Sequence, residues 1–402
     1  MSKVMTEVLF VDDDLSTLEG LESRLKVLRD EWRMRFVSGA QAALIAMQEQ
    51  PTDVVVTDMK MADMDGAELL RQVRLRWPET VRLILSGNTS QDAVMRSLPV
   101  AHQFLAKPCD LTQLRQVIVR ARALQLCLYS PGVTAAVGSL KSLPAVPRLF
   151  QALNQELNSG RGTAKSVAEI IEQDMAMTLR LLQLVNSAFF GLTRRVTHIR
   201  EAVTYLGFEP IRSLVASAEL FRAMSKMCAP KGFSLEEIQQ HALRVGSLTQ
   251  QLLTDREQQR TAFCASILHD IGRVALAVAL PEDFSRTREL AEAKGVPLHQ
   301  AEQIVFKCTH AEISAHILAL WGLPNPLVEA VAFHHRPADL PEPQFGIAGA
   351  IHVADALDHL RPTPGVAKAD PYDRFDREYL RSVGMLGELP KWIAATQAPA
   401  AA

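Results

Sequence analysis

The sequence predicts two domains of different class: an N-terminal α/β domain built on a five-stranded parallel sheet, followed by an all-α domain. Three observations lead to this prediction. The length of 402 residues favours two or three domains. Residues 1–126 alternate short apolar runs with amphipathic stretches, which is the pattern of successive β-α units. Beyond them almost every segment has a helical period, and no strand pattern stands out.

Five apolar runs predict the strands of the first domain. They are rich in β-branched and aromatic residues and poor in charge, which fits strands buried on both faces. The runs are 8–11, 34–37, 54–57, 82–86 and 103–106. Helical patterns lie between them, such as Leu18, Leu21 and Leu25 at spacings of three and four residues. Open parallel sheets of this kind bind ligands outside the carboxyl ends of their strands.

The second domain is predicted to be entirely helical and to follow a linker. Residues 127–142 carry proline, glycine and serine, which is typical of a linker. We expect the helical domain over residues 143–395, with its core in 143–335. Its helical patterns include 166–190, 211–224 and 311–322. Gly322 and Pro324 are typical helix stops.

The composition excludes several function classes. The net charge of −2 gives no electrostatic reason to expect a nucleic-acid partner. The five cysteines are scattered and never arranged as C-x-x-C, which argues against a disulfide framework or a zinc ribbon. Acidic residues follow the first methionine too soon for a signal peptide, and no apolar run approaches the ~20 residues that span a bilayer. We therefore expect a cytoplasmic protein that binds neither nucleic acid nor a membrane.

Three carboxylates end two of the predicted strands. Asp12 and Asp13 end the first strand, and Asp58 ends the third. The carboxyl ends of parallel strands share one edge of the sheet, so we expect these side chains to converge. Clustered carboxylates repel one another unless a cation lies among them, and an all-oxygen site suits Mg²⁺.

Two further polar residues end strands at the same edge. Ser86 ends the fourth predicted strand and Lys107 ends the fifth. An aspartate beside Mg²⁺, a hydroxyl and an ammonium group is suited to accept a phosphoryl group, because the metal and the lysine neutralise the developing oxygen charge. The alternative is a set of ordinary loop carboxylates and a surface lysine. Five polar residues at the ends of four strands favour the site over that alternative.

Residues 5–125 resemble the receiver domain of bacterial two-component response regulators. The resemblance is carried by the motifs "FVDDD", "VVVTDMKMADMDG", "LILSG" and "FLAKPCD". It implies a flavodoxin-like fold with strand order 2-1-3-4-5 and phosphorylation of Asp58 by a histidine kinase. It further implies Mg²⁺ bound by Asp12, Asp13 and Asp58. The implied switch and phosphate-binding residues are Ser86, Phe104 and Lys107.

One position departs from the receiver pattern. Ala62 stands where the family usually has proline. We expect this departure to loosen the loop after Asp58 without removing a chemical group from the site.

Ten of the eleven histidines follow residue 197, and several of them predict a metal site. Imidazoles and carboxylates that converge from several helices suit a transition metal, and two such sets can hold a metal pair that activates water. The alternative is that these side chains satisfy helix ends and one another through hydrogen bonds. The candidate ligands, each on or at the end of a predicted helix, are His241, His269, Asp270, His310, His334, His335 and Asp355.

The stretch "FCASILHDIGRVAL" resembles the HD superfamily of metal-dependent phosphohydrolases. The order of the seven candidate ligands is similar to that of the HD-GYP cyclic-di-GMP phosphodiesterases. Those enzymes continue after the double histidine with an acidic residue and a Gly-Tyr-Pro loop. Here the chain reads "HHRPADLPEP", with Arg336 in the acidic position. This departure disfavours catalysis.

Residues 140–335 are similar to the HDOD family, the HD-related output domain. The similarity is carried by "LPAVPRLFQALNQELN", "VAEIIEQDMAMTLRLLQLVNSAFFG" and "THIREAVTYLGFEPIRSLV", with small and apolar residues around Asn186-Ser187 and Leu206-Gly207. HDOD domains resemble signalling and interaction modules that have lost hydrolytic activity. No catalytic residue is therefore assigned.

These patterns lead to one interpretation and one alternative. The first is a phosphorelay response regulator whose receiver switches a non-catalytic HDOD domain that binds other proteins, among them cyclic-di-GMP signalling proteins. The alternative is a receiver-gated, metal-dependent phosphodiesterase acting on cyclic-di-GMP or another nucleotide, with iron or manganese in the helical domain. A homodimer is compatible with both. A transcription factor is disfavoured, because no helix-turn-helix with basic recognition residues stands out.

Overall fold

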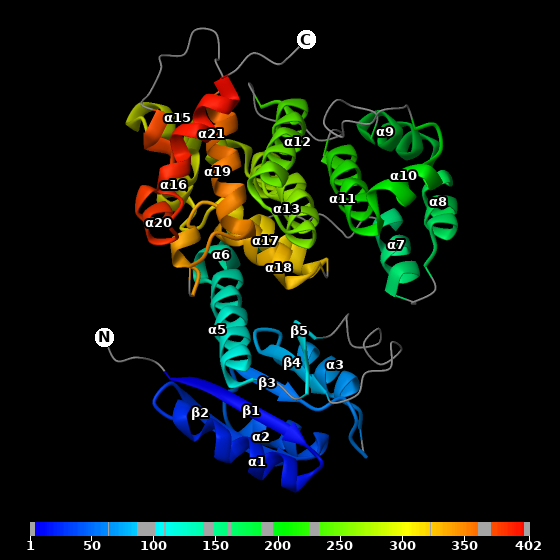
Figure 1. Cartoon of the computed structure of the whole chain (residues 1–402), viewed down its shortest axis with the longest axis vertical. Coiled ribbons are helices and arrows are strands. Elements are labelled where there is room, and N and C mark those ends of the chain that lie inside the picture. Colours follow the sequence, from blue (N-terminus) through cyan, green and yellow to red (C-terminus); the bar gives the residue numbers. More distant parts are fainter. Residues whose placement is uncertain are drawn as a thin grey trace. The chain divides into compact units, whose positions relative to one another are not determined.

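The computed structural model contains two compact units, which are described separately. The α/β unit comprises Met1–Tyr129 with Asn158–Gly160, and the helical unit comprises Ser130–Leu157 with Arg161–Ala402. Blue and cyan mark most of the α/β unit in Figure 1. The structure describes residues 5–62, 64–86, 101–107, 110–139, 148–158, 162–185, 196–224, 233–321, 323–341, 343–360 and 371–397.

The α/β unit contains the predicted parallel sheet. Its five strands are hydrogen-bonded in the order β2-β1-β3-β4-β5, and every neighbouring pair is parallel, which confirms the predicted fold class. The strands are β1 (Thr6–Asp12), β2 (Trp32–Ser38), β3 (Val54–Thr57), β4 (Val81–Ser86) and β5 (Gln103–Ala106). Because every residue of β3 is buried, the central strand reads as a continuous apolar run and not as an alternating one.

Helices cover both faces of this sheet. They are α1 (Leu15–Leu25), α2 (Ala40–Glu49), α3 (Gly66–Arg76) and α5 (Leu111–Leu128), with a short helix η1 (Lys26–Leu28). Successive strand residues point to opposite faces, so Phe10 packs in a core with Leu25 and Ile118, whereas Leu9 packs with Leu44 and Leu70. α1 and α5 therefore cover one face, and α2 and α3 cover the other.

The helical unit is built from helices alone in the part of the chain that is described. Its first helices are α6 (Pro131–Ser139), α7 (Arg148–Asn158), α8 (Ala164–Glu172), α9 (Met175–Val185), α10 (Ile199–Leu206) and α11 (Phe208–Met224). The next are α12 (Leu235–Leu252), α13 (Arg256–Leu268), α14 (Ile271–Ala279), α15 (Pro281–Lys294), α16 (Leu298–Val305), α17 (His310–Leu320), α18 (Asn325–Phe333) and α19 (Ile347–His359). The remaining segments are η3 (Pro337–Asp339), η4 (Pro371–Arg374), α20 (Arg377–Ser382), η5 (Leu386–Glu388) and α21 (Leu389–Gln397).

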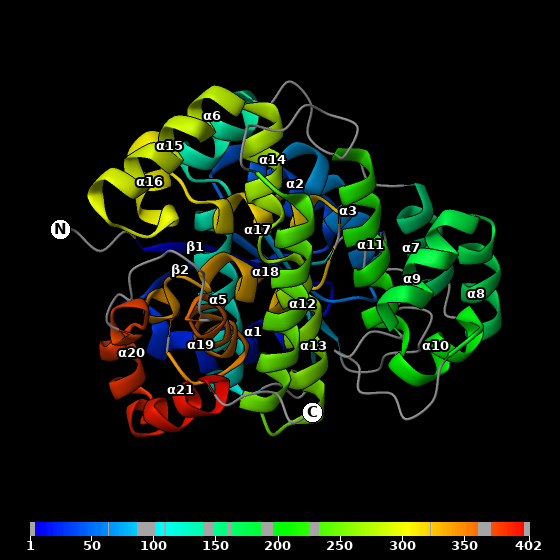
Figure 2. The same cartoon turned by 90° about the horizontal axis from the view of Figure 1, so that it is seen from above.

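Helix α13 lies at the centre of this unit and packs against α11, α12, α18 and α19 (Figure 2). It is followed at once by α14, and the two form the apolar run Arg256–Ala279, long and apolar enough to cross a membrane by length and composition alone. An apolar window of 18 residues within that run is 83% buried in the protein, which is typical of core helices. Its apolarity is therefore explained by the core.

The predicted linker differs from the structure. Residues 131–139, within the segment 127–142, form helix α6, which packs against α17. Val133 is 0% exposed there, so this small helix contributes to the core despite its proline and glycine. The proline is the first residue of the helix, where its missing N–H costs nothing.

Gly132 should be intolerant of a side chain. A Cβ at this position would lie 2.1 Å from the carbonyl oxygen of Lys307, a residue with a φ of 60°. We expect Gly132→Ala to destabilise the helical unit by about 1–3 kcal/mol, because backbone must move to admit the methyl group. Urea denaturation of the full chain, followed by circular dichroism, measures the loss.

Gly387→Ala is the matched control, because a methyl group at this position would meet nothing within 4 Å. Equal unfolding midpoints for the two variants would contradict the contact between α6 and the Lys307 backbone.

Candidate functional site

The carboxyl edge of the sheet brings together an ammonium group and two carboxylates. Asp12 is the last residue of β1, Asp58 follows β3 and Lys107 follows β5. Lys107 Nζ donates to Asp12 Oδ2 and to Asp58 Oδ1, each at 2.7 Å. Burial lowers the pKa of Lys107, but its hydrogen bonds to the two carboxylates outweigh this effect and raise it. The lysine is therefore charged and cross-links two strand ends.

Asp13 points to a different partner. Its Oδ2 accepts a hydrogen bond from the backbone N–H of Ala62 at 2.8 Å. A proline at position 62 has no N–H, so the departure at this residue creates a bond that the family's usual residue cannot make. The expectation that Ala62 only loosens the loop is therefore wrong: its N–H ties the loop after Asp58 to Asp13.

The two remaining residues that the sequence predicts for this site, Ser86 and Phe104, lie on the predicted strands. Ser86 is the last residue of β4, and Phe104 lies in β5 opposite Ile84. The side chains of Ser86 and Phe104 fall outside the described part of the structure.

The helical unit gathers the seven candidate ligands from six helices and their ends. His241 lies in α12 and Asp355 in α19. His269 directly follows the last residue of α13, and Asp270 precedes the first residue of α14. The remaining three are His310, which begins α17, and His334 and His335, which follow α18.

His269 and His334 occupy the same local position. Each directly follows the last residue of a helix, and its Nδ1 donates to the carbonyl three residues earlier, Ser266 at 2.6 Å and Val331 at 2.8 Å. Both side chains are 0% exposed. Among the described atoms the Nε2 of each has no hydrogen-bond partner. The helix end therefore fixes the ring and leaves one nitrogen facing the interior.

Carboxylates orient His241 and His310 in the same way, by bonding to the Nδ1 of each ring. His241 Nδ1 bonds to Asp358 Oδ2 at 2.8 Å, and His310 Nδ1 bonds to Glu302 Oε2 at 2.6 Å. Their Nε2 atoms face Asp270 from opposite sides, at 3.8 Å for His241 and 3.1 Å for His310. All four rings thus turn Nδ1 outward and Nε2 inward.

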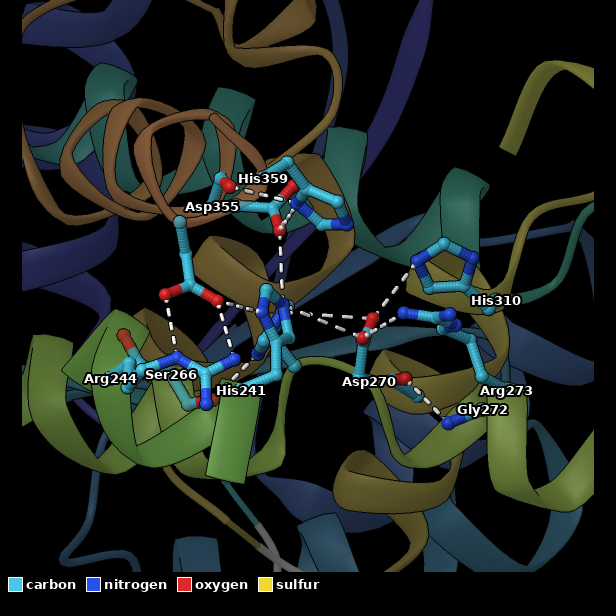
Figure 3. Close-up of polar contacts among 12 residues, drawn as sticks. His241, Arg244, Ser266, Asp270, Gly272, Arg273, His310, Asp355 and His359 are labelled. Atoms are coloured by element: carbon cyan, nitrogen blue, oxygen red, sulfur yellow. Dashed lines mark hydrogen bonds and ion pairs between the residues drawn. The ribbon is translucent and has the colours of Figure 1, made fainter. Parts of the chain in front are cut away.

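The Asp270 carboxylate lies between His241 and His310 (Figure 3). It is 3% exposed and accepts a hydrogen bond from Arg273 at 2.6 Å. In each of three groups the ligand atoms of three residues lie within 4.8 Å of one another, and one of these groups is His241, Asp355 and His359. The first histidine group is His241, His269 and Asp270, and the second histidine group is His310, His334 and His335. In the described part of the chain, compact groups of this kind occur only in the helical unit.

Two imidazoles of the cluster are cationic without a metal. Burial lowers the pKa of His241, but its bonds to Asp355 and Asp358 outweigh burial and raise the pKa to about 9. For His310, burial is likewise outweighed by the charge of Glu302 and the bond to Asp270, and the pKa rises to about 9. Carboxylates therefore stabilise a proton on each ring.

The other three imidazoles are neutral. Burial holds the pKa of His269 below its ordinary value, and the pKa values of His334 and His335 well below it. The inward Nε2 of His269 and His334 is therefore a lone pair in need of a donor or a cation. His335 differs, because its Nε2 lies 2.9 Å from His310 Nε2 and its ring stacks on His299.

A cleft of about 940 Å³ opens beside the first histidine group. His241 and Arg273 line it together with Arg244, whose guanidinium bonds both oxygens of Asp358. Two phenylalanines, Phe233 and Phe284, meet edge to face on the same cleft. The buried cluster therefore borders a cleft at His241 and Arg273.

Arg336, which stands where HD-GYP enzymes have an acidic residue, has a structural role here. Its Nη2 donates to Glu312 Oε1 at 2.6 Å. Glu312 in turn accepts the backbone N–H of Thr309 and caps the first turn of α17. Arg336 therefore braces the helix that begins with His310.

Four residues of the site are absent from the sequence prediction. Glu302 and Asp358 orient imidazoles, and Arg273 neutralises Asp270. His359 bonds to Asp355 one turn earlier on α19. Helical spacing is the signal that could have found Arg273, Asp358 and His359, because each lies three or four residues from a predicted ligand. No such signal marks Glu302, because it lies on another helix.

Comparison with known protein families also divides the chain into an N-terminal and a C-terminal domain. Residues 8–119 match the family model described as a response regulator receiver domain, and residues 143–337 match the model described as an HDOD domain. A solved HDOD domain protein with unknown function from Geobacter sulfurreducens is 21% identical, with a TM-score of 0.50, covering 68% of this chain and 97% of its own. At this identity the likeness shows the fold alone.

Two curated proteins are similar in sequence. An uncharacterized protein of Treponema pallidum is 25% identical over 275 residues, which cover 67% of this chain and 52% of that protein. The hydrogenase transcriptional regulatory protein HoxA of Cupriavidus necator is 34% identical over 110 residues, which cover 27% of this chain and 22% of HoxA. The chain therefore spans about half or less of the length of these relatives.

The Ala62 N–H should compete with a cation for Asp13. Replacing Ala62 with proline removes the donor and frees one carboxylate oxygen, so we expect Ala62→Pro to bind Mg²⁺ several-fold more tightly than the unaltered chain. Calorimetric titration with Mg²⁺ measures the affinity. Ala62→Gly keeps the N–H and serves as the control. An unchanged affinity in Ala62→Pro would show that the Asp13–Ala62 bond does not restrain the site.

Proposed function

Because the chain contains a response regulator receiver domain followed by an HDOD domain, we propose that it is a phosphorelay response regulator that accepts a phosphoryl group on Asp58. One observation carries this proposal: the Lys107 ammonium contacts Asp58 and Asp12 at the strand ends. A cation in this position can stabilise phosphoryl oxygens on Asp58. The donor is a histidine kinase: a carboxylate oxygen attacks phosphorus, and the phosphorus–nitrogen bond to the kinase imidazole breaks.

The carboxylates of this edge fit Mg²⁺, which receiver domains use in general. Asp12, Asp13 and Asp58 would hold it with oxygen atoms only, the donor set that Mg²⁺ prefers. The cation supplies neutralisation of the phosphoryl charge. For Asp13 to take part, its oxygen must exchange the Ala62 N–H for the metal.

The output is a change in what the helical unit binds. Phosphorylation adds about two negative charges at the sheet edge, and Ser86 and Phe104 are the proposed residues that respond. The proposed partners are other regulatory proteins, such as proteins of cyclic-di-GMP signalling or a second copy of this chain. The proposed compartment is the cytoplasm, where the histidine kinase presents its phosphoryl group.

Phosphoryl labelling tests the assignment of Asp58. Incubation of the full chain with a small phosphodonor and Mg²⁺ should label the unaltered protein, whereas Asp58→Asn should remain unlabelled because the amide is a poor nucleophile. Intact-mass spectrometry counts the phosphoryl groups. Asp53→Asn, which alters another carboxylate of the same unit, is the control. Equal labelling of Asp58→Asn and the unaltered chain would remove Asp58 from this role.

A second candidate function is metal-dependent phosphodiester hydrolysis in the helical unit. It is favoured by the buried, neutral Nε2 atoms of His269 and His334, which have no hydrogen-bond partner among the described residues. Nitrogen and carboxylate ligands of this kind suit iron or manganese. The two histidine groups would hold a pair of ions, with Asp270 between them and Asp355 beside the first. A metal pair supplies an activated water for attack on phosphorus.

Metal analysis of the purified full chain tests this candidate. We expect close to two equivalents of iron or manganese in the unaltered protein and at least a tenfold loss in a His269→Ala, Asp270→Ala double variant that remains folded. Hydrolysis of cyclic-di-GMP by the loaded protein would make the helical unit an enzyme. Metal without turnover would leave it a metal-binding interaction domain, and a metal-free unaltered protein would overturn the candidate.

A further inference from the structure

We infer that Asp358 and Glu302 are positioning residues, and that each of them controls metal binding by one of the two histidine groups. This inference rests on the proposed metal site. Each carboxylate determines which nitrogen of a histidine ring faces the proposed metal. Neither carboxylate is itself a proposed metal ligand.

Asp358 fixes the orientation of His241. The carboxylate is 5% exposed, and Arg244 bonds both of its oxygens, Oδ1 from Nε at 2.7 Å and Oδ2 from Nη2 at 2.9 Å. This bidentate interaction fixes the orientation of the carboxylate. Oδ2 is left to receive His241 Nδ1 at 2.8 Å. The ring therefore presents Nε2 to the first histidine group.

Glu302 fixes His310 by a different geometry. Its side chain is 0% exposed, and Oε2 accepts both the backbone N–H of His310 at 2.8 Å and the ring Nδ1 at 2.6 Å. Because both donors belong to one residue, the bond sets the side-chain rotation of His310 relative to the start of α17. The ring therefore presents Nε2 to the second histidine group.

The rings of His269 and His334 are oriented without a carboxylate. His269 and His334 bond to carbonyls of the helices they end, so their orientation is set by local backbone geometry. Each histidine group thus contains one ring oriented by its own helix and one oriented by a carboxylate on another helix. The carboxylates are 117 residues from His241 in one case and eight residues from His310 in the other. Removing one of them should leave the other group intact.

The physical effect of each carboxylate is to keep the proton on Nδ1 and to make Nε2 more basic toward a metal. An amide of the same shape offers a weaker acceptor, and its NH₂ can face the ring, which favours the opposite tautomer. Loss of such an outer partner typically weakens metal binding by about 10–100-fold.

Cobalt titration of the metal-free full chain tests the inference. In a buffer with excess Mg²⁺, which occupies the carboxylates of the sheet edge, we expect two equivalents of Co²⁺ in the unaltered protein, detected by elemental analysis and by the visible absorption of Co²⁺ bound to imidazole. Asp358→Asn and Glu302→Gln should each weaken one equivalent by about 10–100-fold and keep the other. Their absorption spectra should differ, since a different group stays occupied. The Asp358→Asn, Glu302→Gln double variant should weaken both.

Glu312→Gln is the matched control. Glu312 is a buried glutamate that caps α17, and its carboxylate bonds Thr309 and Arg336. This variant should bind both equivalents as the unaltered chain does. Loss of both equivalents in all three single variants would mean a general structural role and would overturn the inference.

The outcomes for the metal site and for the positioning residues are distinct. An unaltered chain that binds no Co²⁺ overturns the metal site and with it this inference. An unaltered chain that binds two equivalents, with both single variants unchanged, overturns the positioning role alone and leaves the metal site standing.

Discussion

The burial of the Asp270 carboxylate is the constraint on which the centre of the helical unit depends. A carboxylate that is 3% exposed costs several kcal/mol unless cations or hydrogen-bond donors surround it. Arg273 supplies one donor at 2.6 Å and His310 lies 3.1 Å away. The helix-end imidazoles of His269 and His334 do not meet this demand, because each uses its Nδ1–H on a helix carbonyl and turns an unprotonated Nε2 toward the interior.

The two units use the same physical device with different donors. In the α/β unit the carboxylates of Asp12 and Asp58 meet one lysine at the ends of parallel strands. In the helical unit the carboxylates meet imidazoles at the ends of helices. In both sites a cationic side chain, a lysine in one unit and protonated histidines in the other, lies beside the carboxylates that we propose to bind a metal. Binding of a cation or a phosphoryl group would therefore change the charge balance of both sites.

The sequence predicted the sheet well, because strand order and strand ends follow from apolar runs and from the geometry of parallel sheets. It predicted that histidines far apart in the chain gather, because each lies on or at the end of a predicted helix. It missed what backbone atoms and other helices contribute. Ala62 acts through its N–H, α6 forms within residues that look like a linker, and Glu302 reaches His310 from another helix. Side-chain identity alone carries no signal for such contacts.

The proposal on which the role of the helical cluster depends is that its inward-facing imidazole nitrogens bind metal. Crystals of the full chain grown with Mn²⁺, and measured near the manganese absorption edge, test this most directly. The account predicts two anomalous peaks within the cluster, one at the first histidine group and one at the second, on either side of Asp270. A map with no peak among these side chains, with manganese present in the crystal and seen only elsewhere, would contradict it.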